Sequence, residues 1–183
     1  MNPVEILNAE HLALTITRLC HELVENHDDF SKTALIGLQP RGVMLSNRIV
    51  DRLTEITGLN NIRHGHLDIT FHRDDFRRKS DPVLPGKTRM DFQVENLKVV
   101  LIDDVLFTGR TIRAGLDALL TYGRPSKVEL LTLIDRRFSR HLPIQPDYVG
   151  RTVDSIAHEK VEVEWGDRPG EGRVMMKSVK LMP

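Results

Sequence analysis

The chain has 183 residues, which is enough for one domain with a buried core. Its 26 Lys and Arg residues balance 26 Asp and Glu residues, so the formal net charge of zero provides no general attraction to nucleic acid. A single cysteine, Cys20, excludes an intramolecular disulfide and argues against a cysteine-based zinc site. No run approaches the roughly 18 apolar residues of a membrane helix, and the first residues lack the features of a secretion signal. We therefore expect one cytoplasmic domain, residues 1–183, without membrane contact.

The spacing of apolar residues predicts an alternation of helices and strands. Apolar residues three and four positions apart predict helices over residues 8–26, 45–56 and 111–122. Short apolar or alternating runs predict strands over residues 33–38, 67–71, 99–102, 128–134, 161–165 and 173–181. Asn8 is the expected N-cap of the first helix, and Gly58 is expected to end the second. This order is typical of an α/β fold with a mostly parallel sheet flanked by helices.

Residues 72–91 have a different composition. They are rich in charge, proline and glycine, as in Arg77-Arg78-Lys79 and Pro85-Gly86. Loops of this length inside a compact domain are uncommon and are usually functional or disordered. We predict a flexible loop that serves a binding site, and a disordered insertion without such a role is the alternative.

The segment 103–111 carries the clearest chemistry. An apolar strand runs into Asp103 and Asp104, and Thr108-Gly109-Arg110-Thr111 then opens a predicted helix. Ligands of parallel α/β sheets bind where the strands end, and a helix that begins there presents free N–H groups to an anion. Gly109 lets the backbone come close, and the threonine hydroxyls add donors. The pattern predicts a phosphate-binding loop.

The two acids indicate a second part of the same ligand. Ionised Asp103 and Asp104 only accept hydrogen bonds, so they do not face that phosphate directly. Two sugar hydroxyls beside the phosphate satisfy them, and a ribose 5-phosphate provides both groups. A P-loop requires Gly-Lys-Ser/Thr, which is absent. A Walker-B-like strand end leaves the Thr-Gly-Arg-Thr loop unexplained, and a solvated Asp-Asp turn leaves the apolar strand unexplained.

This segment resembles the signature of type I phosphoribosyltransferases. The resemblance implies their fold, with a small hood formed by residues from about 135 to 183 plus the N-terminal part. It implies that Asp103 and Asp104 bind the ribose hydroxyls of phosphoribosyl pyrophosphate (PRPP) and that Arg73, in the flexible loop, contacts pyrophosphate. An ordinary solvated arginine is the alternative for Arg73. The residues implied to bind PRPP or phosphate are Thr108, Gly109, Arg110, Thr111, Gln39, Pro40 and Arg41.

A longer set of strings resembles the PyrR family, the pyrimidine-operon regulators that are also uracil phosphoribosyltransferases. The strings that carry this resemblance include Leu14-Thr15-Ile16-Thr17-Arg18, Gly123-Arg124-Pro125-Ser126 and Asp147-Tyr148-Val149-Gly150. The resemblance implies that uracil and PRPP react to give UMP and pyrophosphate, with Mg²⁺ held mainly through PRPP. It also implies a homodimer or a higher homo-oligomer.

The base site is expected at Phe107, Tyr148 and Val149. Enzymes that act on hypoxanthine or guanine usually have an acid directly before the Thr-Gly pair, where this chain has Phe107. This difference argues against purine substrates and leaves a purine phosphoribosyltransferase as the most distant alternative. The chain departs from the PyrR pattern over residues 135–141, which are one residue longer, and at Gln145, where the family often has a basic residue.

The resemblance implies a second activity, the binding of a stem-loop in pyrimidine-operon leader mRNA. The residues implied to bind RNA are Thr17, Arg18, His21, Arg140 and Arg151. Residues three and four positions apart share one side of a helix, which agrees with the spacing of the first three. Solvated surface residues are the alternative. The sequence therefore supports an enzyme that also binds RNA, or a UMP-sensing RNA-binding regulator with weak or no catalysis.

Overall fold

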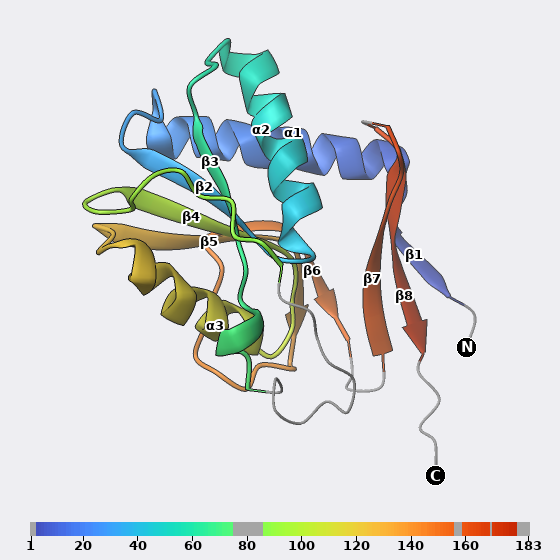
Figure 1. Cartoon of the computed structure of the whole chain (residues 1–183). Helices are drawn as coiled ribbons and strands as arrows, with labels where there is room; N and C mark the ends of the chain where they lie inside the picture. The colour runs from blue at the N-terminus through green and yellow to red at the C-terminus, as the bar shows by residue number, and fades with distance from the viewer. Residues whose placement is uncertain (1–2, 75–85, 156–158, 169, 179–183) are drawn as a thin grey trace.

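A computed structural model describes residues 3–74, 86–155, 159–168 and 170–178. At its centre lies a sheet of parallel strands in the order β3-β2-β4-β5-β6 (Figure 1). The strands of this sheet are β2 (Thr33–Leu38), β3 (Arg63–Leu67), β4 (Lys98–Leu106), β5 (Lys127–Arg137) and β6 (Tyr148–Asp154). The predicted parallel α/β architecture is confirmed, and β4 occupies the middle of the sheet.

Helices cover both faces of this sheet. α1 (Ala9–His27) and α2 (Gly42–Thr57) lie on one face, and α3 (Arg110–Leu119) lies on the other (Figure 1). The predicted helix ends are confirmed for two of them: the side chain of Asn8 accepts a hydrogen bond from the backbone N–H of His11, and Gly58 ends α2 with φ of 73°. α3 is followed by one turn of 3₁₀ helix, η2 (Leu120–Tyr122). Each face buries its own apolar cluster, so the central strands are buried on both sides.

A second, smaller sheet stands beside the first. Its antiparallel strands have the order β1-β8-β7, with β1 at Val4–Leu7, β7 at Glu159–Trp165 and β8 at Gly172–Ser178. Arg48 of α2 connects the turn between β7 and β8 to the main body. Its guanidinium donates to the backbone carbonyls of Gly166, Arg168 and Glu171 at 2.8, 3.2 and 2.6 Å.

Some predicted strand boundaries are wrong. The strand expected over residues 67–71 ends at Leu67, because the carboxylate of Asp68 accepts from both N–H and hydroxyl of Thr70. This local turn leads into the 3₁₀ helix η1 (Thr70–His72). β4 and β5 run further than predicted, since their ladder continues to the pair of Leu106 and Asp135. Residues 179–181 of the last predicted strand lie outside the described residues, and β1 and β6 were not predicted.

The predicted flexible loop, residues 72–91, is described only in part. Residues 75–85 lie outside the described residues. Residues 86–91 are attached to the main sheet, because the backbone of Arg89 exchanges hydrogen bonds of 2.9 and 2.8 Å with that of His66 on β3. The side chain of Gln39 also donates to the carbonyl of Lys87 at 2.9 Å. Residues 86–91 thus have partners on β3 and in the loop after β2, and the flexibility of the loop stays a prediction. Within the described ranges, no helix combines the length and the apolar character required to cross a membrane.

Gly42 fixes how closely α2 approaches the central strand. It is the first residue of the helix, and a Cβ atom at this position would overlap the backbone carbonyl oxygen of Ile102 on β4. The loop 39–41 is thereby held directly beside the part of β4 that contains Asp103 and Asp104.

Substitution Gly42→Ala should therefore destabilise the protein. We expect the free energy of unfolding to fall by about 1–3 kcal/mol, because the added methyl group forces α2 away from β4. Chemical denaturation monitored by circular dichroism measures this change. An unaltered unfolding midpoint would show that the helix has room to move and that this contact does not fix its position.

Candidate functional site

Asp103 and Asp104 lie side by side near the carboxyl end of β4 and are both buried, with 5% and 4% of their surface exposed. The backbone N–H of Asp104 donates to the carboxylate of Asp103 at 3.1 Å. Burial raises the pKa of both carboxyl groups, and the negative neighbour raises the pKa of Asp103 further. Arg41 lowers both pKa values, and Arg73 lowers that of Asp103. Hydrogen-bond donors or cations in a ligand would therefore stabilise the charged forms of these buried acids.

The predicted phosphate loop forms one wall of a cavity of about 230 Å³ next to Asp103. Gly109 has φ of 89°, a left-handed conformation that favours glycine, and it directly precedes the first turn of α3. The free N–H groups of this turn and the helix dipole favour an anion there. The described residues that line the cavity are Arg73, Asp74, Asp103, Val105, Leu106, Phe107, Thr108, Gly109, Arg110, Thr111 and Ile112.

Asp104 faces a different cavity, of about 370 Å³. Successive side chains of a strand point to opposite sides, which explains why the two acids separate. The loop after β2 contributes Pro40 and Arg41 to this second cavity, and the Gln39–Pro40 peptide bond is cis. Residues 162–165 of β7 form the opposite wall. The acid pair therefore stands between the N-terminus of α3 and the loop that contains Arg41.

The sequence did not reveal how the segment before residue 75 is attached to α3. Arg110 donates to the carboxylate of Asp74 at 2.8 Å, and Arg113 contacts the same carboxylate. Arg113 also donates to the backbone carbonyl of His72 at 3.1 Å. Arg73 is thereby held at the cavity that Asp103 lines. Arg110 and Arg113 are three residues apart and therefore share one side of the helix, and this spacing is the sequence feature that could have indicated a common partner.

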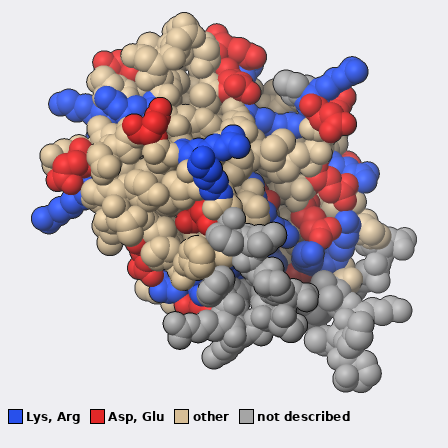
Figure 2. Space-filling model, in the orientation of Figure 1, with Lys and Arg blue, Asp and Glu red and all other residues tan. Residues whose placement is uncertain are grey.

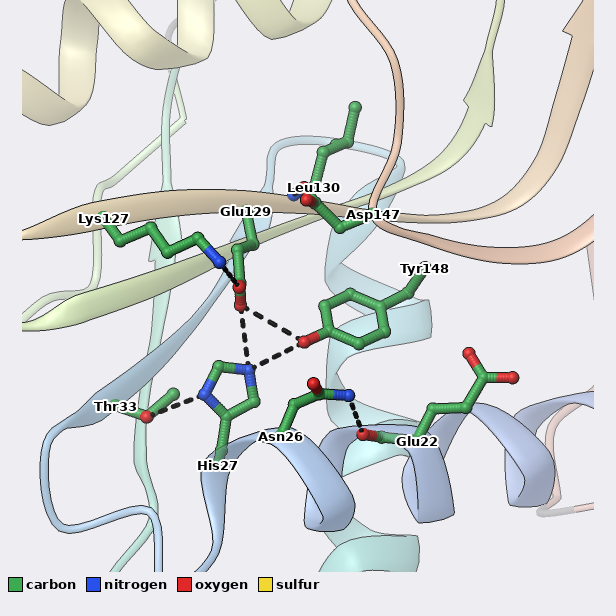
Figure 3. A network of polar contacts seen from close by, with 9 residues as sticks. All are labelled: Glu22, Asn26, His27, Thr33, Lys127, Glu129, Leu130, Asp147 and Tyr148. Carbon is green, nitrogen blue, oxygen red and sulfur yellow. Dashed lines mark hydrogen bonds and ion pairs between the residues drawn. The ribbon is translucent and has the colours of Figure 1, made fainter.

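The structure corrects part of the predicted base site. Phe107 lines the cavity of Asp103, and its contact with the base stays a prediction. Tyr148 is buried elsewhere: its hydroxyl lies 3.1 Å from Nε2 of His27 and 3.2 Å from the carboxylate of Glu129 (Figure 3). The carbonyl of Val149 accepts from Arg18 of α1 at 3.0 Å. Strand register explains the error. Leu106 of β4 pairs with Asp135 of β5, and Asp135 pairs with Thr152 of β6. Tyr148 comes four residues before Thr152, so it lies about 13 Å from the level of Leu106, toward the start of β6.

The polar group around Tyr148 joins three separate elements inside the core. His27 ends α1, Glu129 lies on β5, and Tyr148 begins β6 (Figure 3). Nδ1 of His27 lies 3.1 Å from the hydroxyl of Thr33, and Lys127 binds Glu129 from the outside. Burial lowers the pKa of His27, which favours a neutral ring that donates to Glu129. Every member of this group has a partner, as buried polar groups require.

The residues predicted to bind RNA do not all share one surface. Arg18 and Arg151 line a surface groove of about 320 Å³ together with His11 and Leu14, and His21 is exposed one turn further along α1. Thr17 instead accepts from Arg52 of α2 at 3.1 Å.

Arg140 lies in a different place from this groove. It donates to the carbonyl of Phe107 at 2.6 Å and forms an ion pair with Asp135. Arg140 therefore contacts the phosphate-loop segment and lies apart from the groove of Arg18, and its contact with RNA stays a prediction.

Comparison with known proteins connects this geometry with a family. The model of the phosphoribosyl transferase domain matches residues 4–167. A bifunctional protein PyrR of Caldicellulosiruptor bescii is 41% identical over 175 residues, which cover 96% of this chain and 95% of the relative. The bifunctional protein PyrR of Clostridioides difficile is 40% identical over 94% of this chain and 97% of its own. The chain belongs to the PyrR family.

Solved structures agree with the PyrR assignment at the level of the fold. A hypoxanthine phosphoribosyltransferase of Staphylococcus aureus superimposes with a TM-score of 0.64 at 19% identity, over 84% of this chain and 79% of the other. The enzyme of Trypanosoma cruzi in complex with the product IMP gives 0.65 at 16% identity, over 85% and 82%. At this level of identity, the likeness shows the type I phosphoribosyltransferase fold alone. In this PyrR-family chain, both acids and the phosphate loop lie within the matched domain.

The position of Tyr148 can be tested by removing its hydroxyl. Tyr148→Phe should lower the free energy of unfolding by about 1 kcal/mol, because Glu129 and His27 each lose one buried partner. UMP affinity, measured by calorimetry, should stay within about twofold, since a twofold change corresponds to a small free-energy difference. Tyr122→Phe is the matched control, because the Tyr122 hydroxyl has no partner among the described residues. A large loss of UMP affinity in Tyr148→Phe alone would return this residue to the base site.

Proposed function

We propose that the protein transfers a 5-phosphoribosyl group from PRPP to uracil, with UMP and pyrophosphate as products. The observation that carries this proposal is the buried pair of Asp103 and Asp104, which stands between the N-terminus of α3 and the loop that bears Arg41. PRPP contains the matching groups in the matching order: a 5-phosphate, two ribose hydroxyls and a pyrophosphate. Membership in the PyrR family supports uracil as the acceptor.

In this mechanism, the chain mainly binds and orients. The first turn of α3 and the loop 108–111 hold the 5-phosphate by N–H and hydroxyl donors. Asp103 and Asp104 accept hydrogen bonds from the ribose hydroxyls and stabilise positive charge that develops on the sugar during transfer. N1 of uracil forms a bond to C1 of the ribose, the bond from C1 to the pyrophosphate oxygen breaks, and the N1 proton is lost.

The leaving pyrophosphate requires positive charge. The positive charge of Arg41 lowers the pKa of both acids, and that of Arg73 lowers the pKa of Asp103. We therefore assign both arginines to the pyrophosphate. The described residues contain no group of three or more His, Cys, Asp or Glu side chains placed to hold a metal ion. We expect Mg²⁺ to be held mainly by oxygens of PRPP and water, as this ion retains much of its water and binds substrate phosphates. When bound, Mg²⁺ neutralises charge on the pyrophosphate as it leaves.

The direct test follows UMP formation from labelled uracil, PRPP and Mg²⁺, with hypoxanthine and guanine in parallel. Wild-type protein should form UMP and no purine nucleotide. Asp104→Asn should lower turnover at least about 100-fold, because one acceptor for the ribose hydroxyls and its negative charge are lost. Its thermal stability should be unchanged or higher, since an amide avoids the cost of burying a carboxylate.

A matched control for this substitution is Asp51→Asn, on the exposed side of α2. It should leave both turnover and stability unchanged. Unaltered turnover in Asp104→Asn would contradict the role of the acid pair, and equal use of hypoxanthine would contradict the choice of uracil.

We also propose that the protein binds pyrimidine-operon leader RNA in response to UMP. The groove lined by His11, Arg18 and Arg151 supports this second activity, because both arginines lie at its surface outside the PRPP site. In the view of Figure 2, basic and acidic side chains are interspersed over the described part of the surface. Binding therefore relies on this local groove, and shape and unpaired bases of the RNA are the expected determinants. A regulator with weak catalysis is the alternative within the same family.

RNA binding should depend on Arg151. Arg151→Gln should weaken binding of a leader hairpin several-fold and reduce the salt dependence by about one phosphate contact. UMP formation should not change. Arg124→Gln, in the turn between α3 and β5, is the matched control and should bind RNA like wild type. A gel-shift titration with and without UMP, at several salt concentrations, measures these effects. Equal affinities of both variants and wild type would place the RNA surface elsewhere.

A further inference from the structure

Arg136 is a buried arginine directly beside the candidate base site. It lies near the end of β5, and only 4% of its surface is exposed. Its guanidinium carbon lies 4.0 Å from the centre of the Phe107 ring, so the two groups are in stacking contact. The other side of the guanidinium is also held: Nε donates to the hydroxyl of Ser155 at 2.7 Å, and Nη2 donates to the carbonyl of Glu159 at 2.7 Å. The position of this group is therefore determined by several contacts at once.

Phe107 is held from a second direction by the same segment of chain. Arg140 donates to the backbone carbonyl of Phe107 at 2.6 Å and is paired with Asp135. The ring of Phe107 is thus held by Arg136 near the end of β5, and its main chain is held by Arg140, which follows β5. These two contacts hold Phe107 at both its ring and its backbone.

The position of Phe107 matters because its ring is part of the wall of the cavity that contains Asp103 and the phosphate loop. A base on the ribose is a flat group that packs well against a flat apolar surface. A phenylalanine ring provides such a surface only when its orientation is fixed. Arg136 fixes it from β5, and through Ser155 and Glu159 it connects the wall to the chain that enters β7.

We propose that Arg136 is a positioning residue that holds Phe107 as the wall of the base pocket and so determines how tightly the pyrimidine ring is bound. This inference rests on the proposed function, since it identifies the base-binding part of that site. Arg136 acts through Phe107 and stays out of contact with the reacting atoms. Its planar guanidinium is essential, because the compact ammonium group of lysine does not stack in the same way.

The test compares two ligands that differ only by the base. Binding of UMP and of ribose 5-phosphate to Arg136→Met is measured by calorimetry, together with steady-state kinetics for uracil and PRPP. UMP affinity should fall about tenfold and the KM for uracil should rise by a similar factor, the scale of one lost stacking contact. Affinity for ribose 5-phosphate and the KM for PRPP should stay within about twofold, because the phosphate loop and the acids are intact.

Control variants separate this role from a general effect on folding. Arg137→Met changes the next residue, an exposed arginine paired with Asp154, and should behave like wild type. Arg136→Lys should remain impaired for UMP, since it keeps the charge and loses the stacked plane. Phe107→Leu should give the same base-specific loss, and combining it with Arg136→Met should add little further loss. If Arg136→Met fails to fold, Phe107→Leu and Arg136→Lys still test the proposal.

The outcomes distinguish this inference from the proposed function. Equal losses of UMP and ribose 5-phosphate affinity in Arg136→Met would reduce the residue to a purely structural role and overturn the inference. Wild-type protein that binds UMP no better than ribose 5-phosphate would also overturn it, because no base pocket would exist. A lack of UMP formation by the wild-type protein would contradict only the proposed catalysis. The base-specific difference in binding still confirms or overturns the role of Arg136 in that case.

Discussion

The burial of two adjacent aspartates at the end of β4 is the constraint around which the site is built. Asp103 and Asp104 are carried there by a strand that is buried on both faces and paired on both sides. Their carboxylate forms are unfavourable without donors or cations, and burial accordingly raises their pKa values. The α3 N-terminus, Arg41 and Arg73 surround them and provide part of this compensation. A ligand with hydroxyl donors and bound cations provides the rest, which couples the stability of the site to its occupation.

The elements that surround this pair are connected by arginines that donate to main-chain carbonyls. Arg48 holds the turn between β7 and β8 against α2, Arg136 connects the end of β5 to the start of β7, and Arg140 holds the backbone of Phe107. A guanidinium suits this task because its donors lie in a fixed plane and reach several acceptors. The small sheet is therefore connected to both cavities through side chains that are far apart in the sequence.

β6 connects the two proposed activities. Its first residue, Tyr148, is fixed to α1 by the buried contact with His27, and the carbonyls of Val149 and Gly150 accept from Arg18 at 3.0 and 2.6 Å. The same strand pairs with β5, which ends beside Phe107. The candidate base site, at the end of β5, and the groove of Arg18, beside β6, are thus connected by two paired strands. Both proposed sites therefore depend on the pairing of β5 with β6.

The sequence by itself determined the features that depend on neighbouring residues. The helix cap at Asn8, the end of α2 at Gly58, the buried strand 33–38 and the turn at Gly109 that opens α3 follow from interactions within a few positions, so local patterns predict them. The tertiary structure alone decided the direction of Tyr148, the contacts of Arg140 and the stacking of Arg136 on Phe107. Strand register sets these features, and contacts between distant segments set that register.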